Sequence, residues 1–329
     1  MIMPELGCHK KMLSMQYQGK DYRWEKNGDK VRFLINGKDG IEERKNSFYK
    51  YYALNEYSVD ALTHLYIYDT HPCQLNDPLD CAEDLIVFDD NETTRIMLGD
   101  MFSEVSNIYQ NDEKAINEFE RVAFRTYYYM KMGIFSLTKN CDDMSMWSYY
   151  TNHEGFCIEY DINGFPYDYW GPFPINYQKE LKSVSINQAS LPLASLIQTN
   201  IKLDCWEHEQ EWRLLIQCPE ECYMEPFGFN AELIKANMIN LHDRKMKYPL
   251  RCIKSVILGL KFFNGIYSVI TDYEKEYVAT NKKKNEVLSF LALSKIPTYI
   301  LDTDGFKAII VPIEITKIRN NAYHIYTKG

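Results

Sequence analysis

The sequence predicts an α+β fold, with mixed or antiparallel central sheets and helices packed around them. The chain has 329 residues, 46% of them hydrophobic and 25% charged, which is an ordinary globular composition. Short strand patterns and helical patterns alternate irregularly along it, and no internal repeat is visible. A doubly wound parallel sheet would require regular alternation. No GxGxxG segment opens a helix after a strand, so a dinucleotide-binding fold of the Rossmann type is not expected.

Apolar spacing and turn residues predict the elements of the first half of the chain. Strand 31–35 precedes a tight turn at Asn36 and Gly37. Asn55 is a suitable N-cap for a helix over 56–65. Prolines predict a loop over 70–84. The other elements predicted here are strands 48–54, 66–68, 134–138 and 156–161 and helices 93–110, 113–131 and 143–150.

The second half is predicted in the same way. A segment rich in Pro, Gly and aromatic residues predicts a loop over 162–176. The elements that follow are strand 181–186, helix 191–203, strands 211–217 and 251–260, helices 264–279 and 285–294, and strands 297–301 and 307–315. We divide the chain into an N-terminal extension (1–46), a core domain (47–262) and a C-terminal helix–strand extension (263–329).

Charge and cysteine usage exclude several classes of protein. The net charge is −9, whereas a general binder of nucleic acid is normally basic. Nine cysteines without a CxxC pair are typical of a reducing compartment. The N-terminus lacks the apolar core of a signal peptide, and no window has the length of a membrane span. We therefore expect a soluble, cytoplasmic protein with no membrane partner and no metal site.

The segment Glu211–Trp212–Arg213 is the strongest candidate for chemistry. On a strand, Glu211 and Arg213 share one face. A carboxylate beside a cation can stabilise a developing oxocarbenium ion or hold a ribose hydroxyl. The alternative is a structural ion pair on a sheet edge, although such a pair adds little stability for the desolvation that it requires.

Two further segments could bind a ligand. The rigid turn Asn76–Asp77–Pro78 could present Asn76 or Asp77 to a ligand, or could simply tie a loop to the core. Trp147 and Tyr150 lie three residues apart on a short helix and could stack against a flat ring. Core packing is the alternative for Trp147, while the roles of Tyr150 and the nearby His153 stay open.

The first strand of the core domain supplies another candidate. Lys50 lies between Tyr49 and Tyr51, so it points away from both on a strand. Its ammonium group could contact a phosphate as a point charge. The two tyrosines could equally be core residues.

Several of these segments follow one another as in a known bacterial family. They are YKYYALN at 49–55, LNDPLD at 75–80, Phe135–Ser136, MWSYY at 146–150, HEGFCIEYD at 153–161 and EQEWR at 209–213. In this order they resemble the family of proteins called domain of unknown function 2971, over about residues 48–262. Tyr52 stands where the family usually has Arg, Leu75 and Leu79 where it has Phe, and Tyr149 where it has His.

This resemblance implies a class of function. Members of the family are suspected to be effectors in bacterial conflict or phage defence. The motif order is also similar to that of the ADP-ribosyltransferase superfamily, in which a polar residue lies on an early strand, a Ser, Thr or Tyr on a middle strand, and a Glu on a later strand holds the nicotinamide ribose. The similarity implies an ADP-ribosyltransferase-like fold and an enzyme that uses NAD as substrate, either hydrolysing it or modifying a protein or nucleic-acid target.

The same similarity suggests roles for individual residues. Glu211 would stabilise the ribosyl cation, with Arg213 as the second catalytic residue. Arg213 and Lys50 would contact phosphates, and Ser136 and Asn76 would be polar anchors. The residues expected to bind NAD are Lys50, Tyr51, Asn76, Asp77, Ser136, Trp147, Tyr150 and His153.

Two other functions remain open at this point. One is a non-catalytic sensor or protein-binding module, in which the tyrosines and residues 263–329 form a partner surface. The other is a metal-dependent nuclease, in which paired carboxylates hold Mg²⁺ for phosphoryl transfer. The carboxylates considered for it are Asp77, Asp80, Glu159 and Glu211.

Overall fold

The computed structural model describes residues 13–27, 30–87, 112, 114, 132–186, 188–217, 244–263 and 274–327. Apart from residue 114, the predicted helices 93–110 and 113–131 lie outside the described residues. The fold is mixed α/β, with more strand than helix. In the described part of the chain, no helix combines the length and the apolar character that a membrane span needs.

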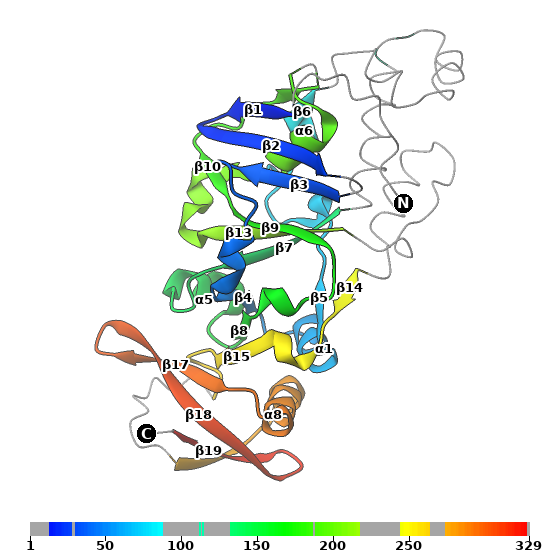
Figure 1. Ribbon diagram of the computed structural model, residues 1–329. Coiled ribbons are helices and arrows are strands. Elements are labelled where there is room, and N and C mark those ends of the chain that lie inside the picture. The colour runs from blue at the N-terminus through cyan, green and yellow to red at the C-terminus, as the bar shows by residue number, and fades with distance from the viewer. Residues whose placement is uncertain are drawn as a thin grey trace.

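One ten-stranded mixed sheet runs through the molecule (Figure 1). Its order is β16 (Glu274–Val278), β19 (Ala322–Thr327), β18 (Lys307–Arg319), β17 (Thr298–Asp304), β15 (Ile253–Leu258), β8 (Phe156–Tyr160), β4 (Phe48–Tyr52), β7 (Met132–Thr138), β13 (Glu211–Gln217) and β9 (Tyr169–Pro174). Neighbours are antiparallel except β15 and β17, which are parallel. The C-terminal extension therefore continues the sheet of the core domain.

The N-terminal extension forms a separate antiparallel sheet of β1 (Ser14–Tyr17), β2 (Lys20–Asn27) and β3 (Lys30–Ile35). The predicted tight turn follows β3, because Asn36 and Gly37 both have positive φ angles, 51° and 74°, and Ile35 pairs with Lys38. Three further two-stranded pairs join β5 (Tyr66–Tyr68) with β14 (Lys245–Lys247), β6 (Ile86–Val87) with β11 (Val184–Ser185), and β10 (Asn176–Gln178) with β12 (Ile201–Leu203).

The described helices are α1 (Glu56–His64), α5 (Met144–Thr151), α6 (Leu191–Gln198) and α8 (Lys282–Ser294). All but α6 begin with a side-chain cap. The predicted N-cap Asn55 is confirmed, since its side chain accepts a hydrogen bond from the N–H of Ser58. Asp143 and Asn281 cap α5 and α8 in the same way. These caps satisfy backbone donors that a helix leaves unpaired.

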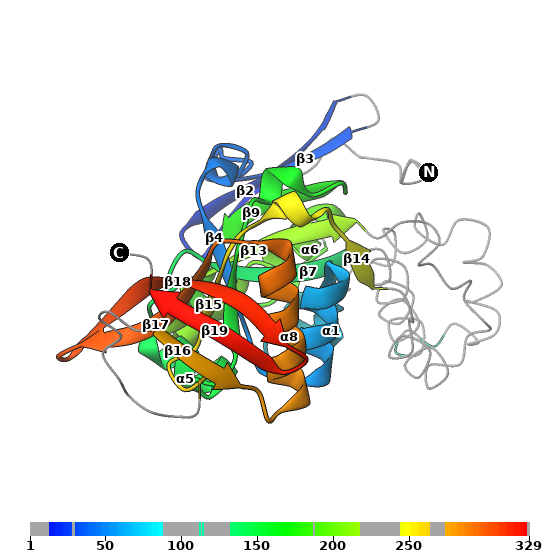
Figure 2. The ribbon, with the colours of Figure 1, turned by 90° about the horizontal axis from the view of Figure 1, so that it is seen from below.

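The two faces of the sheet are covered differently. Helices α1 and α8 lie side by side over one face (Figure 2), where Leu62 and Leu288 join the largest core cluster. The other face holds two smaller clusters. One lies beneath α6 and the N-terminal sheet and includes Phe33 and Leu193. The other lies beneath α5 and includes Trp147 and Leu301.

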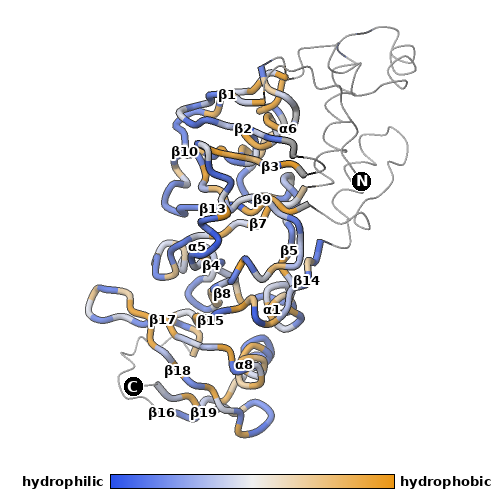
Figure 3. The backbone as a smooth tube through the Cα atoms, in the orientation of Figure 1, coloured by the Kyte–Doolittle hydropathy of each residue, from blue (hydrophilic) through white to orange (hydrophobic). Residues whose placement is uncertain are grey.

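The side chains of strand β13 alternate between the two faces of the sheet and therefore belong to different core clusters. Leu214 and Ile216 of β13 belong to the large cluster, while Leu215 between them belongs to the cluster beneath α6. Residues of one strand point alternately to opposite faces, so Glu211 and Arg213 share the face of Leu215. In Figure 3, hydrophobic colour follows much of β7 and β9, and hydrophilic colour surrounds α5.

The structure corrects several predicted elements. Segment 162–176 is not only a loop, because it contains the edge strand β9. The helix predicted over 191–203 ends at Gln198, and β12 occupies Ile201–Leu203. Within the helix predicted over 264–279, residues 274–278 form strand β16, and residues 264–273 lie outside the described residues. Strand 181–186 shrinks to Val184–Ser185. Strands β1, β2, β6, β10, β14 and β19 were not predicted.

Candidate functional site

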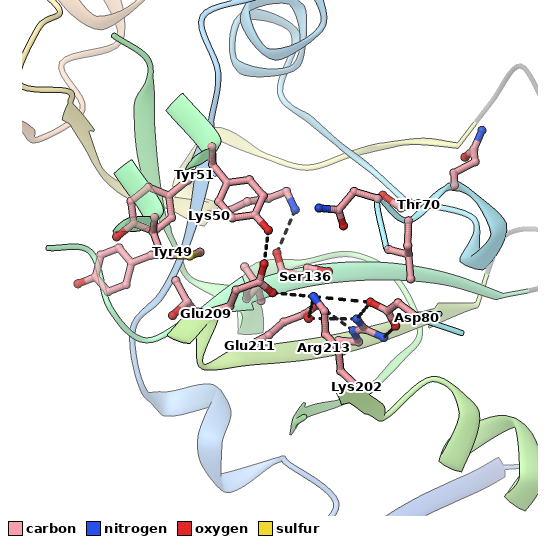
Figure 4. Close-up of a pocket in the computed structure, with 17 residues that line it drawn as sticks. Tyr49, Lys50, Tyr51, Thr70, Asp80, Ser136, Lys202, Glu209, Glu211 and Arg213 are labelled. Atoms are coloured by element: carbon pink, nitrogen blue, oxygen red, sulfur yellow. Dashed lines mark hydrogen bonds and ion pairs between the residues drawn. The ribbon is translucent and has the colours of Figure 1, made fainter. Parts of the chain in front are cut away.

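A pocket of about 180 Å³ lies beside strands β4, β7 and β13 of the large sheet (Figure 4). Its walls come from β4, β7, β12, β13, helix α5 and the loop around residues 70–80. The lining residues are Tyr49, Lys50, Tyr51, Thr70, Gln74, Leu75, Asn76, Asp80, Ser136, Leu137, Thr138, Met146, Tyr150, Lys202, Glu209, Glu211 and Arg213. Most of them carry polar or charged groups, so the pocket suits a hydrophilic ligand.

An interruption between β4 and β7 opens this part of the sheet. The two strands share a single pair of residues, Tyr49 and Thr138. Further along, the carbonyl oxygen of Ser136 accepts a hydrogen bond from Nζ of Lys50 at 3.0 Å. Lys50 lies on the opposite face of β4 from Tyr49 and Tyr51, yet all three line the pocket. Side chains from both faces of β4 therefore reach one site.

Arg213 is the centre of a buried network of ion pairs. Its Nε donates to Oε1 of Glu211 at 2.8 Å, and its Nη2 donates to Oε2 of the same residue at 3.0 Å. Nη1 and Nη2 both donate to the carboxylate of Asp80, and Nη1 also donates to the carbonyl oxygen of Thr199 at 3.0 Å. An arginine has five N–H donors, and all five are engaged here.

Lys202 joins a third carboxylate to this network. Its Nζ lies 2.7 Å from Oε2 of Glu209, 3.3 Å from Oε2 of Glu211 and 3.7 Å from Oδ2 of Asp80. The hydroxyl of Tyr150 donates to Oε1 of Glu209. Each charged side chain in the network is almost completely buried. Buried charges are tolerated when they are paired and hydrogen-bonded, which this arrangement achieves.

The network fixes the ionisation of Glu211 and Lys202. Burial alone would raise the pKa of Glu211, but Arg213 and Lys202 outweigh that effect and lower it to about 2. Burial alone would lower the pKa of Lys202, but Glu211, Glu209 and Asp80 outweigh that effect and raise it. Glu211 is therefore a carboxylate and Lys202 an ammonium ion at neutral pH.

The pocket brings three carboxyl groups and three basic side chains together. Asp80, Glu209 and Glu211 form the ion pairs with Lys202 and Arg213, and Lys50 lines the same pocket. A fixed carboxylate can stabilise positive charge that develops on a bound ligand.

The structure brings most of the predicted site residues together in this pocket. Glu211, Arg213, Lys50, Tyr51, Asn76, Ser136 and Tyr150 all line it. The prediction that Glu211 and Arg213 share a face of one strand is confirmed by their hydrogen bonds.

Asp77, Trp147 and His153 are not among the lining residues. Asp77 accepts a hydrogen bond from the N–H of Leu79 and so forms the turn that was its structural alternative. Trp147 is fully buried and donates to the carbonyl oxygen of Cys141. Trp147 is thus a core residue beneath α5, and the ring stacking expected of it does not fit its position. His153 follows the end of α5 with a φ of 60°.

Two residues that the sequence did not single out are central to the pocket. Lys202 comes from β12 and Glu209 from a 3₁₀ helix, Asp204–Glu209, that precedes β13. The signals in the sequence for Glu209 were its place in the EQEWR segment and the nearby acidic residues Glu207 and Glu211. Lys202 had no such signal, because its segment was predicted as helix.

The four carboxylates considered for a nuclease do not form one cluster, since Asp77 and Glu159 do not line the pocket. Glu159 accepts hydrogen bonds from Ser47 and Ser255, away from the pocket lining. Asp80 and Glu211 both lie in the pocket, but Arg213 is bound between them. In the described ranges, no cluster of three or more His, Cys, Asp or Glu residues has a geometry suited to a metal ion.

Comparisons of the chain with protein-family models, with curated proteins and with solved structures found no match.

Proposed function

We propose that the pocket cleaves the N-glycosidic bond between nicotinamide and ribose in NAD, and passes the ADP-ribosyl group to water or to a macromolecular target. The C1′–N bond breaks, its electron pair goes to nicotinamide, and the ribosyl group becomes an oxocarbenium ion. A nucleophile then adds to C1′. The motif resemblance suggests this chemistry, and the buried Glu211, ion-paired with Arg213 and Lys202 in the pocket, is the observation that carries the proposal.

Glu211 would act on this reaction through its charge. A carboxylate with a pKa of about 2 is a poor general base, because catalytic groups work best with a pKa near the operating pH. It suits the stabilisation of positive charge on the ribose ring. Arg213 and Lys202 hold its position, so little reorganisation accompanies the reaction.

The size of the pocket limits which part of NAD enters it. A cavity of about 150 Å³ can hold a benzene ring, so about 180 Å³ suits one ring-sized group and not a dinucleotide. We assign this space to the ribose ring that carries the scissile bond. Asn76, Ser136 and Tyr150 offer polar contacts there, while the rest of the molecule would extend outside the pocket.

The network also changes the role proposed for Arg213. Its five donors are engaged with Asp80, Glu211 and Thr199, so a phosphate would have to displace one of these partners. We therefore propose that Arg213 positions Glu211 and does not contact a phosphate.

A role in bacterial conflict or phage defence, suggested by the resemblance, would follow from depletion of NAD or modification of a target.

The test is release of nicotinamide from NAD by the purified protein, with and without cell lysate, followed by chromatography. Glu211→Gln is the diagnostic variant, and Glu159→Gln is the matched control. Glu159 is a half-buried glutamate of the same sheet that lies outside the pocket lining. We expect release by the wild-type protein and by Glu159→Gln, and a loss of at least about 100-fold in Glu211→Gln, as for removal of one stabilising group in other enzymes.

Folding of each variant is checked by circular dichroism and thermal melting. A folded Glu211→Gln protein that retains full activity would contradict the proposal. So would a complete lack of nicotinamide release under all conditions. A complete lack of nicotinamide release combined with measurable binding of NAD would instead favour the non-catalytic sensor.

A further inference from the structure

We propose that Lys50 is a nucleophilic amine that forms an imine with the carbonyl carbon of a small aldehyde, such as an open-chain aldose, bound in the pocket. The proposal concerns the same pocket as the NAD chemistry but rests on different residues. It assigns Lys50 a covalent role in place of the phosphate contact that the sequence suggested.

The surroundings of Lys50 differ from those of the other cations in the pocket. Lys202 and Arg213 lie within ion-pair distance of carboxylates, whereas among the described residues Lys50 has no ion pair within 4 Å. Its Nζ donates to the backbone oxygen of Ser136 and lies 4.9 Å from the centre of the Phe135 ring. In Figure 4 it projects over Ser136, apart from the ion pairs of Asp80 and Arg213.

This environment raises the fraction of the Lys50 side chain that is a neutral amine. Burial lowers the pKa of Lys50 from 10.5 to about 8, against the opposing effects of Glu211 and Glu209 and with a smaller contribution from Arg213. These three charged residues come from β13 and the 3₁₀ helix before it. The neighbouring strand β7 contributes only the uncharged Phe135 and Ser136 at this position. Lysines activated by desolvation are the ones that form Schiff bases.

The reaction balances without an oxidant or reductant. The lone pair of Nζ attacks the carbonyl carbon and gives a carbinolamine. Loss of water then gives the imine, and that water carries the carbonyl oxygen and the two protons of the amine. Carboxylates of Glu209 and Glu211 line the same pocket and can accept hydrogen bonds from sugar hydroxyls, which favours a hydroxylated aldehyde.

The test uses the full chain with D-ribose and sodium cyanoborohydride at pH 7, which reduces any imine to a stable secondary amine. Intact mass and peptide mapping then show which lysines carry the sugar. With a pKa of about 8, the neutral fraction of Lys50 at pH 7 exceeds that of an exposed lysine of pKa about 10.4 by about two orders of magnitude. We expect Lys50 to be modified first, at least about tenfold faster than the exposed Lys282.

Two variants make the result specific. Lys50→Arg keeps the positive charge but cannot form an imine, so it should abolish the early adduct. Lys139→Arg is the control, because Lys139 is a half-buried lysine paired with Glu43 outside the pocket lining, and its replacement should leave the early adduct unchanged. If surface lysines of the wild-type protein carry the sugar while Lys50 remains unmodified, the proposal is overturned.

The experiment also separates this proposal from the NAD chemistry. Adduct formation requires no cleavage of NAD, and Glu211→Gln should still be modified at Lys50. A protein that releases nicotinamide but leaves Lys50 unmodified would overturn only the imine proposal. A protein that is modified at Lys50 but releases no nicotinamide would overturn only the proposed glycosidic activity.

Discussion

At the scale of single residues, Arg213 determines how the pocket is built. Its planar guanidinium group binds two carboxylates in pairs of hydrogen bonds, a geometry that lysine cannot reproduce. Asp80 and Glu211 are far apart in the sequence. Both form ion pairs with Arg213 and with Lys202. The network therefore couples the loop before Cys81 to strand β13.

Removal of the Arg213 side chain should strongly destabilise the fold. In Arg213→Met, Asp80 and Glu211 stay buried with Lys202 as their remaining cation, and breaking a buried ion pair costs about 3–5 kcal/mol. Urea unfolding at pH 7 measures this loss. The control is Arg319→Met, since Arg319 is largely exposed and pairs with Glu276 on the surface, where such pairs contribute less than about 1 kcal/mol. Equal losses in the two variants would contradict the account.

Glu211 should make stability depend on pH in a defined window. Its pKa in the folded protein, about 2, is below its value in the unfolded chain, about 4.3. The stabilisation is thus complete above the unfolded value and is lost as the pH falls toward 2. Urea midpoints of the wild-type protein and Glu211→Gln should differ most at pH 7 and converge below about pH 4. A difference that stays constant down to pH 2.5 would show that the Glu211 carboxyl is not held ionised.

The same residues show what the sequence could predict about the site. Glu211 and Arg213 could be placed on one face because alternation along a strand depends only on spacing. Lys202 and Glu209 could not be placed, because their side-chain directions depend on an early helix end at Gln198 and on a 3₁₀ helix closed by Gln210 with a φ of 44°. These local conformations have no periodic signature in the sequence.

At the scale of elements, α5 controls one wall of the pocket. Met146 and Tyr150 of this helix line the pocket, while Trp147 anchors it in the core below. Its N-cap Asp143 accepts hydrogen bonds from the N–H groups of Ser145 and Met146. The position of Tyr150, and through it the hydrogen bond to Glu209, thus depends on a short helix of eight residues.

Loss of this cap should weaken the helix and the pocket together. Asp143→Ala removes the acceptor, and such changes cost about 0.5–2 kcal/mol. Asp143→Asn retains a capping oxygen and should stay within about 0.5 kcal/mol of the wild-type protein, because asparagine is an equally good cap. Chemical denaturation measures both variants. An Asp143→Ala protein as stable as Asp143→Asn would indicate that packing of Trp147 alone holds α5.

Strand prediction failed where pairing partners decide the structure. Strand β9 contains Pro172 and Pro174, which argue against a central strand, but β9 is the edge of the sheet and an edge strand tolerates proline. Strand β16 is also an edge, and Tyr277 is its buried apolar residue. Its charged sequence has no clear alternation, so its conformation depends on pairing with β19.

At the scale of the whole molecule, the C-terminal extension packs against residues that line the pocket. Its strand β17 pairs in parallel with β15 of the core domain. Leu301 of β17 packs in the same cluster as Tyr51, Met146 and Trp147. Two of these residues, Tyr51 and Met146, line the pocket. A boundary at residue 262 could be drawn from the sequence match, but the sheet and this cluster cross it.

A cavity in this shared cluster should destabilise the molecule. Leu301 is fully buried, and replacing a buried leucine by alanine costs about 2–5 kcal/mol. The control Leu293→Ala changes a leucine of α8 that is 77% exposed, and surface changes usually stay within about 0.5 kcal/mol. Both variants are compared by urea unfolding, followed by Trp fluorescence. A Leu301→Ala protein that loses no more stability than Leu293→Ala would mean that the extension does not support the cluster beneath α5.

The pH dependence of nicotinamide release from NAD between pH 5 and 7.5 is the most direct test of the role proposed for Glu211. With a pKa of about 2, Glu211 is a carboxylate throughout this range. We therefore expect kcat/KM for nicotinamide release to show no decline toward pH 5, and we expect the rate of Glu211→Gln to stay far below that of the wild-type protein. A rate that falls with a pKa between 5 and 7 would show that the reacting carboxyl titrates, and an absence of release throughout would contradict the proposed chemistry itself.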